Sequence, residues 1–318
     1  MDIALIGYGR WGKNLYNTLN KIETINNIYV CDPTLNEETS KLKILSLEEI
    51  KEQKEIKGVV VASPASTHFE ITKTFLEVGK HVFCEKPLCF TENELNVLKN
   101  LVLDKKLILI SGHTFLFNDS IKYLKNHIKK NKLKFRAVFG KYSSYGTNVK
   151  DVDVLWDFGP HVISIMNYVF DSKPHETNLY PVSNREDGKL ESCYLNLKYD
   201  KPQTNVMFEL SWLNVDKKRE IDFNNYETLI KWDDLKINKP IQIYEKQFQK
   251  EEIDGVFAHF HNIENKITVP FHETNEPLVN EMKYFIDSIM NEEYTNLISG
   301  IEFTEEVIKI LCNLSQKI

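Results

Sequence analysis

The first third of the chain alternates short apolar runs with amphipathic segments. Each run has the length and composition of a strand buried on both faces: Ile3–Ile6, Ile28–Cys31, Gly58–Ala62, His81–Cys84 and Leu107–Ile110. The segment after the first run has apolar residues at helical spacing, at Trp11, Leu15, Leu19 and Ile22. This alternation predicts an α/β domain with a doubly wound parallel sheet, whose ligand lies at the carboxyl ends of the strands.

Local end signals predict two further helices in this part of the chain. One covers Thr67–Val78, and Gly79 follows it as a C-terminal cap. The other begins near Thr91, which forms a capping-box pair with Glu94.

Beyond residue 118 the pattern changes to alternation with a period of two. Val206, Phe208, Leu210 and Trp212 are apolar, as in an antiparallel strand that is covered on one face. Strands of this kind begin near Phe135, and further runs lie at about 190–199, 219–224, 226–232 and 240–245. Helical patterns lie at about 157–170, 278–291 and 302–316. A chain of 318 residues suits two cores, so we expect domains at 1–117 and 118–318.

The first strand runs directly into a glycine-rich turn, Gly7-Tyr8-Gly9-Arg10-Trp11-Gly12. In a G-x-G-x-x-G turn between a strand and a helix, the first Gly makes the tight turn and the second admits a pyrophosphate. The third lets helix and strand pack closely, so that the helix N-terminus points at the phosphates. The turn therefore predicts a dinucleotide site. The alternative is a Gly-rich turn in an ordinary α/β domain.

Asp32 ends the second strand, twenty residues after Gly12. A carboxylate at this place accepts hydrogen bonds from the ribose hydroxyls of the adenosine and repels a 2′-phosphate. The sequence therefore favours NAD over NADP. Alternatively, Asp32 only begins the Asp32-Pro33 turn.

Two more segments follow buried strands of the first domain. The crossing Ala62-Ser63-Pro64-Ala65-Ser66-Thr67-His68 would turn its backbone toward the cofactor, although a capped turn with a structural His68 explains it too. Glu85-Lys86-Pro87 places two charges at a buried strand end, beside a Pro that can be cis. A positively charged nicotinamide ring would disfavour the protonated form of Lys86, which suits a group that shares a proton with a substrate hydroxyl. A solvated turn is the alternative.

Asp157 and His161 lie one helical turn apart in Trp156-Asp157-Phe158-Gly159-Pro160-His161. The carboxylate can hold the imidazole in one tautomer while the other ring nitrogen faces a substrate. Pro160 fits the first turn of this helix. Alternatively, Asp157 is a helix cap and His161 is incidental.

Composition excludes several classes of protein. Hydrophobic residues make up 42% of the chain and charged residues 27%, which is typical of a globular protein and argues against disorder. The net charge of -6 provides no basic footprint for nucleic acid. The five cysteines lack the spacing of a metal site or a disulfide framework. With neither a membrane-length apolar run nor a signal-peptide pattern, we expect a cytoplasmic protein without metal or membrane.

Together with Gly112-His113, these motifs form a set that occurs in the same order in the Gfo/Idh/MocA family of oxidoreductases. The chain resembles that family over its whole length. The resemblance implies a Rossmann domain, then an α+β domain with a large open, mostly antiparallel sheet. The exposed face of that sheet would pack against a partner subunit in a homodimer or homotetramer. The resemblance further implies that Lys86 bonds the reacting oxygen, that His161 is the general acid and base, and that Asp157 orients His161. We expect NAD to contact Gly7, Gly9, Arg10, Trp11, Gly12, Asp32, Ala62, Ser63, Pro64, His68, Glu85 and Lys86.

Two segments are similar to the nucleotide-sugar branch of the family, that of UDP-N-acetylglucosaminuronate 3-dehydrogenases. They are Val152-x-Val154-Leu155-Trp156-Asp157 and Asn275-Glu276-Pro277-Leu278-x-x-Glu281. A sugar nucleotide needs cations for its diphosphate; the candidates are Arg136, Arg185, Arg219, Lys141 and Lys150.

We therefore expect an NAD-dependent dehydrogenase that transfers a hydride between a ring carbon of a sugar, or nucleotide sugar, and nicotinamide. Two alternatives stay open. One is an NAD-dependent glycoside hydrolase, in which oxidation is transient and no NADH accumulates. The other is a non-catalytic NAD-binding regulator.

Overall fold

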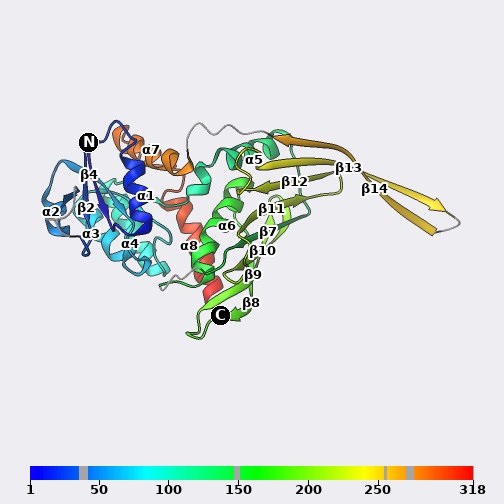
Figure 1. The fold of residues 1–318 in the computed structure, drawn as a ribbon, viewed down its shortest axis with the longest axis horizontal. Coiled ribbons are helices and arrows are strands. Elements are labelled where there is room, and N and C mark those ends of the chain that lie inside the picture. The colour runs from blue at the N-terminus through cyan, green and yellow to red at the C-terminus, as the bar shows by residue number, and fades with distance from the viewer. Residues whose placement is uncertain (36–41, 147–150, 254–255, 270–275, 318) are drawn as a thin grey trace. The chain divides into compact units, whose positions relative to one another are not determined.

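The computed structural model of the chain describes residues 1–35, 42–146, 151–253, 256–269 and 276–317 (Figure 1). The chain divides into two compact units. The first contains Met1–Asn118, Lys150–Val152 and Asn275–Asn313. The second contains Asp119–Val149, Asp153–Thr274 and Leu314–Ile318. Our sequence-based division placed all residues after 117 in one domain, whereas in the structure most of the last two helices belongs to the first unit.

The first unit is built on a six-stranded parallel sheet in the order β3-β2-β1-β4-β5-β6. Its strands are β1 (Asp2–Ile6), β2 (Asn27–Cys31), β3 (Lys43–Ile44), β4 (Ile56–Val61), β5 (His81–Cys84) and β6 (Leu109–Ser111). The order in which strands are added reverses between β1 and β4: β2 and β3 lie on one side of β1, and β4, β5 and β6 lie on the other. In a doubly wound sheet this switch point is where ligands bind, at the carboxyl ends of the strands. The predicted Rossmann sheet is confirmed.

Four of the helices described in the first unit lie between its strands in the sequence, and two come from the end of the chain. They are α1 (Arg10–Leu19), α2 (Leu47–Glu52), α3 (His68–Glu77), α4 (Glu92–Lys105), α7 (Pro277–Met290) and α8 (Ile301–Ser315), with short 3-10 turns η2 (Ala65–Thr67) and η3 (Thr114–Phe117). The capping box of Thr91 with Glu94 is present, and Gly79 ends α3 with a positive φ of 79°. Both end signals are confirmed. The sequence analysis did not predict α2, although Ser46 and Glu49 form a second capping box there.

The core of the first unit joins sequence-distant elements. Leu15 and Leu19 of α1 pack in one apolar cluster with Met282, Phe285 and Ile286 of α7. Gly58 on β4 makes this packing possible, because a Cβ there would lie 2.9 to 3.3 Å from Ile3, Ile289 and Phe285. The C-terminal helix α7 therefore completes the Rossmann core, which local sequence patterns do not reveal.

The second unit contains an eight-stranded sheet in the order β14-β13-β12-β11-β7-β10-β9-β8. Its strands are β7 (Ala137–Ser143), β8 (Glu176–Asn184), β9 (Leu190–Asp200), β10 (Gln203–Ser211), β11 (Lys218–Asn224), β12 (Thr228–Asp233), β13 (Ile241–Ile253) and β14 (Val256–Val269). All neighbouring pairs are antiparallel except β10 with β7, so the predicted mostly antiparallel sheet is confirmed. The sequence analysis missed β8 and β14 and ended β13 too early.

The second unit also contains α5 (Asp119–Lys130) and α6 (Val154–Phe170). The sequence analysis did not predict α5, and it began α6 too late, at about residue 157 instead of Val154. Asp153, not Asp157, caps α6, and its side chain accepts a hydrogen bond from the backbone N–H of Trp156 (2.9 Å). Pro160 therefore lies inside the helix rather than in its first turn. Proline has no N–H, so the helix lacks one internal hydrogen bond beside His161.

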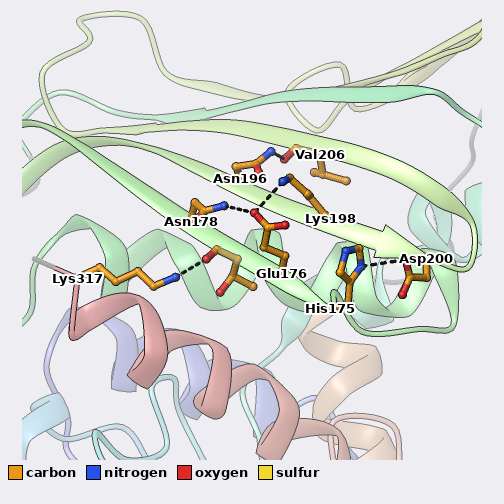
Figure 2. Close-up of polar contacts among 9 residues, drawn as sticks. His175, Glu176, Asn178, Asn196, Lys198, Asp200, Val206 and Lys317 are labelled. Carbon is orange, nitrogen blue, oxygen red and sulfur yellow. Dashed lines mark hydrogen bonds and ion pairs between the residues drawn. The ribbon is translucent and has the colours of Figure 1, made fainter.

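One face of the eight-stranded sheet carries polar rows and exposed aromatic residues. On β8 and β9, Lys198 and Asn178 both point at Glu176, with Lys198 Nζ 2.7 Å from the carboxylate (Figure 2). Two pairs further along the same face, beyond Asn178 with Asn196, Tyr180 pairs with Tyr194; these tyrosines are 52% and 44% exposed. Phe139 on β7 is 56% exposed. Charges near an edge strand discourage unspecific pairing, whereas exposed aromatic residues favour contact with a partner.

Candidate functional site

The glycine-rich turn connects β1 to the start of α1. Gly7 has a φ of +94°, and a Cβ at Gly12 would lie 2.1 Å from the carbonyl oxygen of Gly7. Only glycine fits these two places. Around Gly9 the space is open, with nothing within 4 Å of a Cβ. No side chain caps the N-terminus of α1 among the described residues, so its first N–H groups can meet an anion. The turn therefore fits a dinucleotide phosphate.

Asp32 lies at the end of β2 and is held from two sides. Its Oδ2 accepts a hydrogen bond from the N–H of Tyr8 (2.6 Å), and its Oδ1 accepts from the N–H and hydroxyl of Thr34 (2.8 and 2.6 Å). Although burial acts in the opposite direction, these hydrogen bonds from Thr34 and Tyr8 lower the pKa of Asp32. A negative charge is therefore fixed beside the glycine-rich turn at neutral pH.

The crossing after β4 is tied to the Lys86 loop by a buried histidine. His68 Nε2 lies 2.9 Å from the carbonyl oxygen of Ser63, and Nδ1 lies 2.8 Å from that of Pro87. Burial lowers the pKa of His68, while the two carbonyl groups act in the opposite direction. The imidazole thus bridges two of the predicted cofactor loops, which supports the structural role considered for His68. Pro64 is exposed and Ala62 half-buried at the same strand end.

Glu85 connects three segments at the carboxyl edge of the sheet. Its Oε1 accepts a hydrogen bond from Trp11 Nε1 in the glycine-rich turn, and its Oε2 accepts from the N–H of Lys86 (3.3 Å). The carboxylate also packs on Gly112, where a Cβ would lie 2.7 Å from Oε2. Burial raises the pKa of Glu85, and the Trp11 hydrogen bond and the charge of Lys86 partly offset this effect. Glu85 therefore braces the loop that carries Lys86 rather than facing solvent.

Lys86 is half-buried, and its peptide bond to Pro87 is cis, as the sequence analysis considered. The structure thus brings most predicted cofactor residues to one edge of the first sheet. Arg10 is exposed at the start of α1. Lys86 belongs to the first unit and His161 to the second. The meeting of these two side chains at one substrate oxygen stays a prediction.

In the second unit, Asp157 and His161 lie four residues apart on α6. The imidazole of His161 stacks on the ring of Tyr142 from β7, with centroids 5.5 Å apart and planes 20° apart. Asp157 Oδ2 accepts a hydrogen bond from Trp212 Nε1 (3.2 Å), just after β10. Phe158 packs against the rings of both Tyr142 and Trp212. Aromatic packing therefore fixes this turn of α6 against the sheet.

Among the candidate cations, Arg219 lies in this cluster. Its guanidinium carbon is 5.3 Å from the ring centroid of Tyr142, and its NH1 pairs with Asp234 (2.9 Å). The other candidates have different partners or lie outside the description. Arg136 lies over Tyr226, Arg185 pairs with Asp187, Lys141 pairs with Glu209, and Lys150 is outside the described residues, as is Asn275.

Sequence reasoning missed several side chains of both sites. The sequence analysis places Trp212 only in an alternating strand, and it does not single out Tyr142. Thr114 follows β6, and its hydrogen bond to Glu281 on α7 spans 167 residues, so no local signal could reveal it. Among the described residues, no group of three or more His, Cys, Asp or Glu side chains could hold a metal ion. Nor does any helix in the described ranges have the length and hydrophobicity to cross a membrane.

Comparison with known proteins agrees with the fold. Residues 1–113 match the model of the Gfo/Idh/MocA oxidoreductase family with an NAD-binding Rossmann fold. The fold resembles that of UDP-N-acetylglucosamine 3-dehydrogenase GnnA from Acidithiobacillus ferrooxidans, with a TM-score of 0.79 and 16% identity over 100% of this chain and 97% of that one. It also resembles KijD10, a 3-ketoreductase from Actinomadura kijaniata solved with TDP-benzene and NADP, with a TM-score of 0.81 and 13% identity over 99% and 96%.

In sequence, the chain is 24% identical over 222 residues to the NADP-dependent scyllo-inositol 2-dehydrogenase IolW of Bacillus subtilis. That alignment covers 64% of this chain and 61% of IolW. The chain thus spans less than two thirds of the length of the curated relatives that it matches first. These findings place residues 1–113 in the Gfo/Idh/MocA oxidoreductase family and show that the whole chain shares the fold of the solved structures.

The bond from Trp11 to Glu85 predicts a stability change that depends on pH. Trp11→Phe removes the N–H donor and leaves a buried carboxylate oxygen without it, which should cost about 1–3 kcal/mol. Because that N–H lowers the pKa of Glu85, its removal penalises the ionised form, so the loss should grow as pH rises above the usual Glu range.

Urea unfolding of Trp11→Phe, Glu85→Gln and the double variant measures this effect. We expect the two single changes to be non-additive, with a smaller loss at about pH 4.5 than at about pH 8. A loss that is independent of pH would show that the Glu85 charge does not depend on Trp11.

Proposed function

We propose that this protein is an NAD-dependent dehydrogenase that acts on a ring CH–OH group of a sugar. The observation that carries the proposal is the arrangement around Glu85, which fixes the Lys86 loop to the glycine-rich turn at one edge of the sheet. A cation held beside a dinucleotide turn is suited to a substrate oxygen that becomes negative as a hydride leaves its carbon. NAD would supply the hydride acceptor.

The residues of the chain divide the remaining work. His161 would accept the hydroxyl proton, and Lys86 would steady the resulting negative charge on the same oxygen. Asp157 would hold the imidazole in one tautomer, and Trp212 holds Asp157 in turn. In the opposite direction, His161 would return the proton to the oxygen of a ketone. The glycine-rich turn and the N-terminus of α1 would hold the phosphates.

We propose a nucleotide sugar as the substrate class. The names of two relatives support this proposal, since GnnA acts on UDP-N-acetylglucosamine and KijD10 was solved with a TDP compound. Arg219 supports it from within the chain, because its guanidinium lies over the ring that stacks on His161. A cation at that place suits an anionic group of the substrate.

We also propose that the protein is a homodimer or homotetramer. Its subunits would be joined through the face of the eight-stranded sheet that carries the exposed aromatic residues. Phe139, Tyr180, Val182 and Tyr194 are each 44% to 58% exposed on this face. Exposed apolar patches of this kind mark interfaces between subunits.

Lys86→Ala and His161→Ala should each lower turnover by about 10² or more and leave NAD affinity nearly unchanged. Neither side chain is needed to bind the pyrophosphate. Asp157→Asn should reduce turnover less, because His161 stays in place. Steady-state kinetics on a panel of sugar nucleotides, followed by NADH absorbance, measures this.

Two outcomes would contradict the assignment. If either alanine variant keeps near wild-type turnover, with its fold and NAD binding intact, the assignment of Lys86 and His161 as catalytic residues is wrong. Substrate consumption without net NADH formation would instead indicate the glycoside hydrolase.

Asp32 predicts that NADH binds more tightly than NADPH by at least about tenfold. The reason is that two like charges about 4 Å apart cost about 1 kcal/mol in water and about 4 at an effective dielectric of 20. Separate fluorescence titrations test this. Asp32→Asn should reduce the difference in affinity between NADH and NADPH. The control Glu23→Gln, which alters an exposed carboxylate in the same unit, should leave that difference unchanged. Tighter binding of NADPH by the wild type would overturn the NAD preference.

Phe139→Glu combined with Tyr194→Glu should reduce the mass measured by light scattering at micromolar concentration, because two charges would be buried in the interface. Val215→Glu is the control, since Val215 is 82% exposed outside the strands. A wild-type mass equal to one chain would refute the oligomer.

A further inference from the structure

Glu281 of α7 is a carboxylic acid with no exposed surface. Its Oε2 accepts a hydrogen bond from the hydroxyl of Thr114 (2.7 Å), and its Oε1 has no hydrogen-bond partner among the described residues. Burying an ionised carboxylate without a counter-charge is far more costly than burying a neutral polar group. A protonated carboxyl avoids most of this cost, so the surroundings decide which form is present.

The elements packed against α7 bring no compensating cation to this carboxyl among the described residues. Glu85, at the end of β5, is the charged residue that acts on it, and η3 contributes the hydroxyl of Thr114. Helix α1 and strand β4 meet α7 through the apolar core. His113, beside Thr114, is neutral, because burial and, less strongly, the charge of Lys86 lower its pKa to about 3. On α7 itself, Lys283 is half-buried and Asp287 is exposed.

Glu85 and Glu281 therefore have unequal environments. Glu85 has the N–H of Trp11, the N–H of Lys86 and the positive charge of Lys86. Glu281 has one hydroxyl, and burial followed by the negative charge of Glu85 raises its pKa well above the usual value. When two interacting carboxyl groups differ in this way, the better solvated one keeps the charge and the other keeps a proton.

We propose that Glu281 is protonated at neutral pH and that its neutral carboxyl is a positioning residue for the Lys86 loop. The contacts run from Glu281 through Thr114 to the segment that includes Gly112, on which the Glu85 carboxylate rests. A second negative charge at Glu281 would repel Glu85 and disturb its hold on Lys86. The inference depends on the proposed function only in treating Lys86 as part of a cofactor site.

A protonated, buried carboxyl changes stability with pH in a known direction. Above the usual Glu pKa of about 4.3, the native state retains a proton that the unfolded state releases. Glu281 therefore lowers stability as pH rises, and the unfolding equilibrium constant grows by up to about tenfold per pH unit. Glu281→Gln keeps a neutral group of the same shape and removes this effect.

The experiment measures urea unfolding between about pH 5 and about pH 8, and NADH binding by fluorescence, on the full chain. We expect wild type to lose stability relative to Glu281→Gln as pH rises. Glu302→Gln, which alters an exposed carboxylate on α8, should follow the wild type. Equal slopes for wild type and Glu281→Gln would show that Glu281 is ionised and would overturn the proposal.

NADH affinity tests the positioning role. Glu281→Gln should bind NADH within about twofold of wild type, because it keeps a neutral group. Thr114→Val removes the donor that holds this group, which should disturb Glu85 and, through Trp11, the glycine-rich turn; NADH should then bind about fivefold more weakly, about 1 kcal/mol. Wild-type affinity of a folded Thr114→Val would overturn the positioning role. If the wild type itself binds no NADH, the proposed function fails, while the comparison of pH slopes still decides the protonation of Glu281.

Discussion

A buried carboxylate, that of Glu85, is the constraint on which the cofactor side of this molecule depends. It accepts a hydrogen bond from the glycine-rich turn, another from the backbone of Lys86, and packs on Gly112. These segments belong to three different strand ends, which the parallel sheet brings to one edge. His68 adds a second brace between the crossing after β4 and Pro87. Two polar side chains therefore fix loops that strand pairing alone would leave free.

The second unit reaches a comparable rigidity by different means. Strand register sets Tyr142 on β7 opposite Arg219 on β11 and Leu210 on β10. Tyr142 then provides an aromatic surface for His161, while Trp212, just beyond β10, anchors Asp157. Aromatic rings fit this role, because they combine a large contact area with few rotatable bonds. The helix carries the candidate acid and base, and the sheet determines where they point.

Much of the fold could be predicted, because its signals are local. Apolar runs predict five of the six strands of the first sheet and miss only the two-residue β3, while the capping box of Thr91 and the glycine after α3 predict helix ends. The failures have physical reasons. Trp156-Asp157 looks like a helix start, but the capping bond comes from Asp153, one turn earlier. The motif residues around Lys86 could be named from the sequence, whereas Trp11 as the donor to Glu85, and Glu281 as the partner of Thr114, depend on contacts between distant segments.

Several buried polar groups of the first unit lack hydrogen-bond partners, and some of them lie at the end of β6 or directly after it, next to the loop that carries Lys86. Among the described residues of this unit, buried side-chain atoms without hydrogen-bond partners occur in Thr72, Ser111, His113, Glu281, Ser288 and Ser299. Ser111 and Ser299 are joined by a backbone hydrogen bond, and Ser299 also has a positive φ of 53°. An apolar core at this place would be more stable, so stability alone does not explain these residues. Buried polar groups that lack partners beside one loop are expected where the needs of a functional site, rather than those of the fold, decide which residues are present. The loop in question carries Lys86.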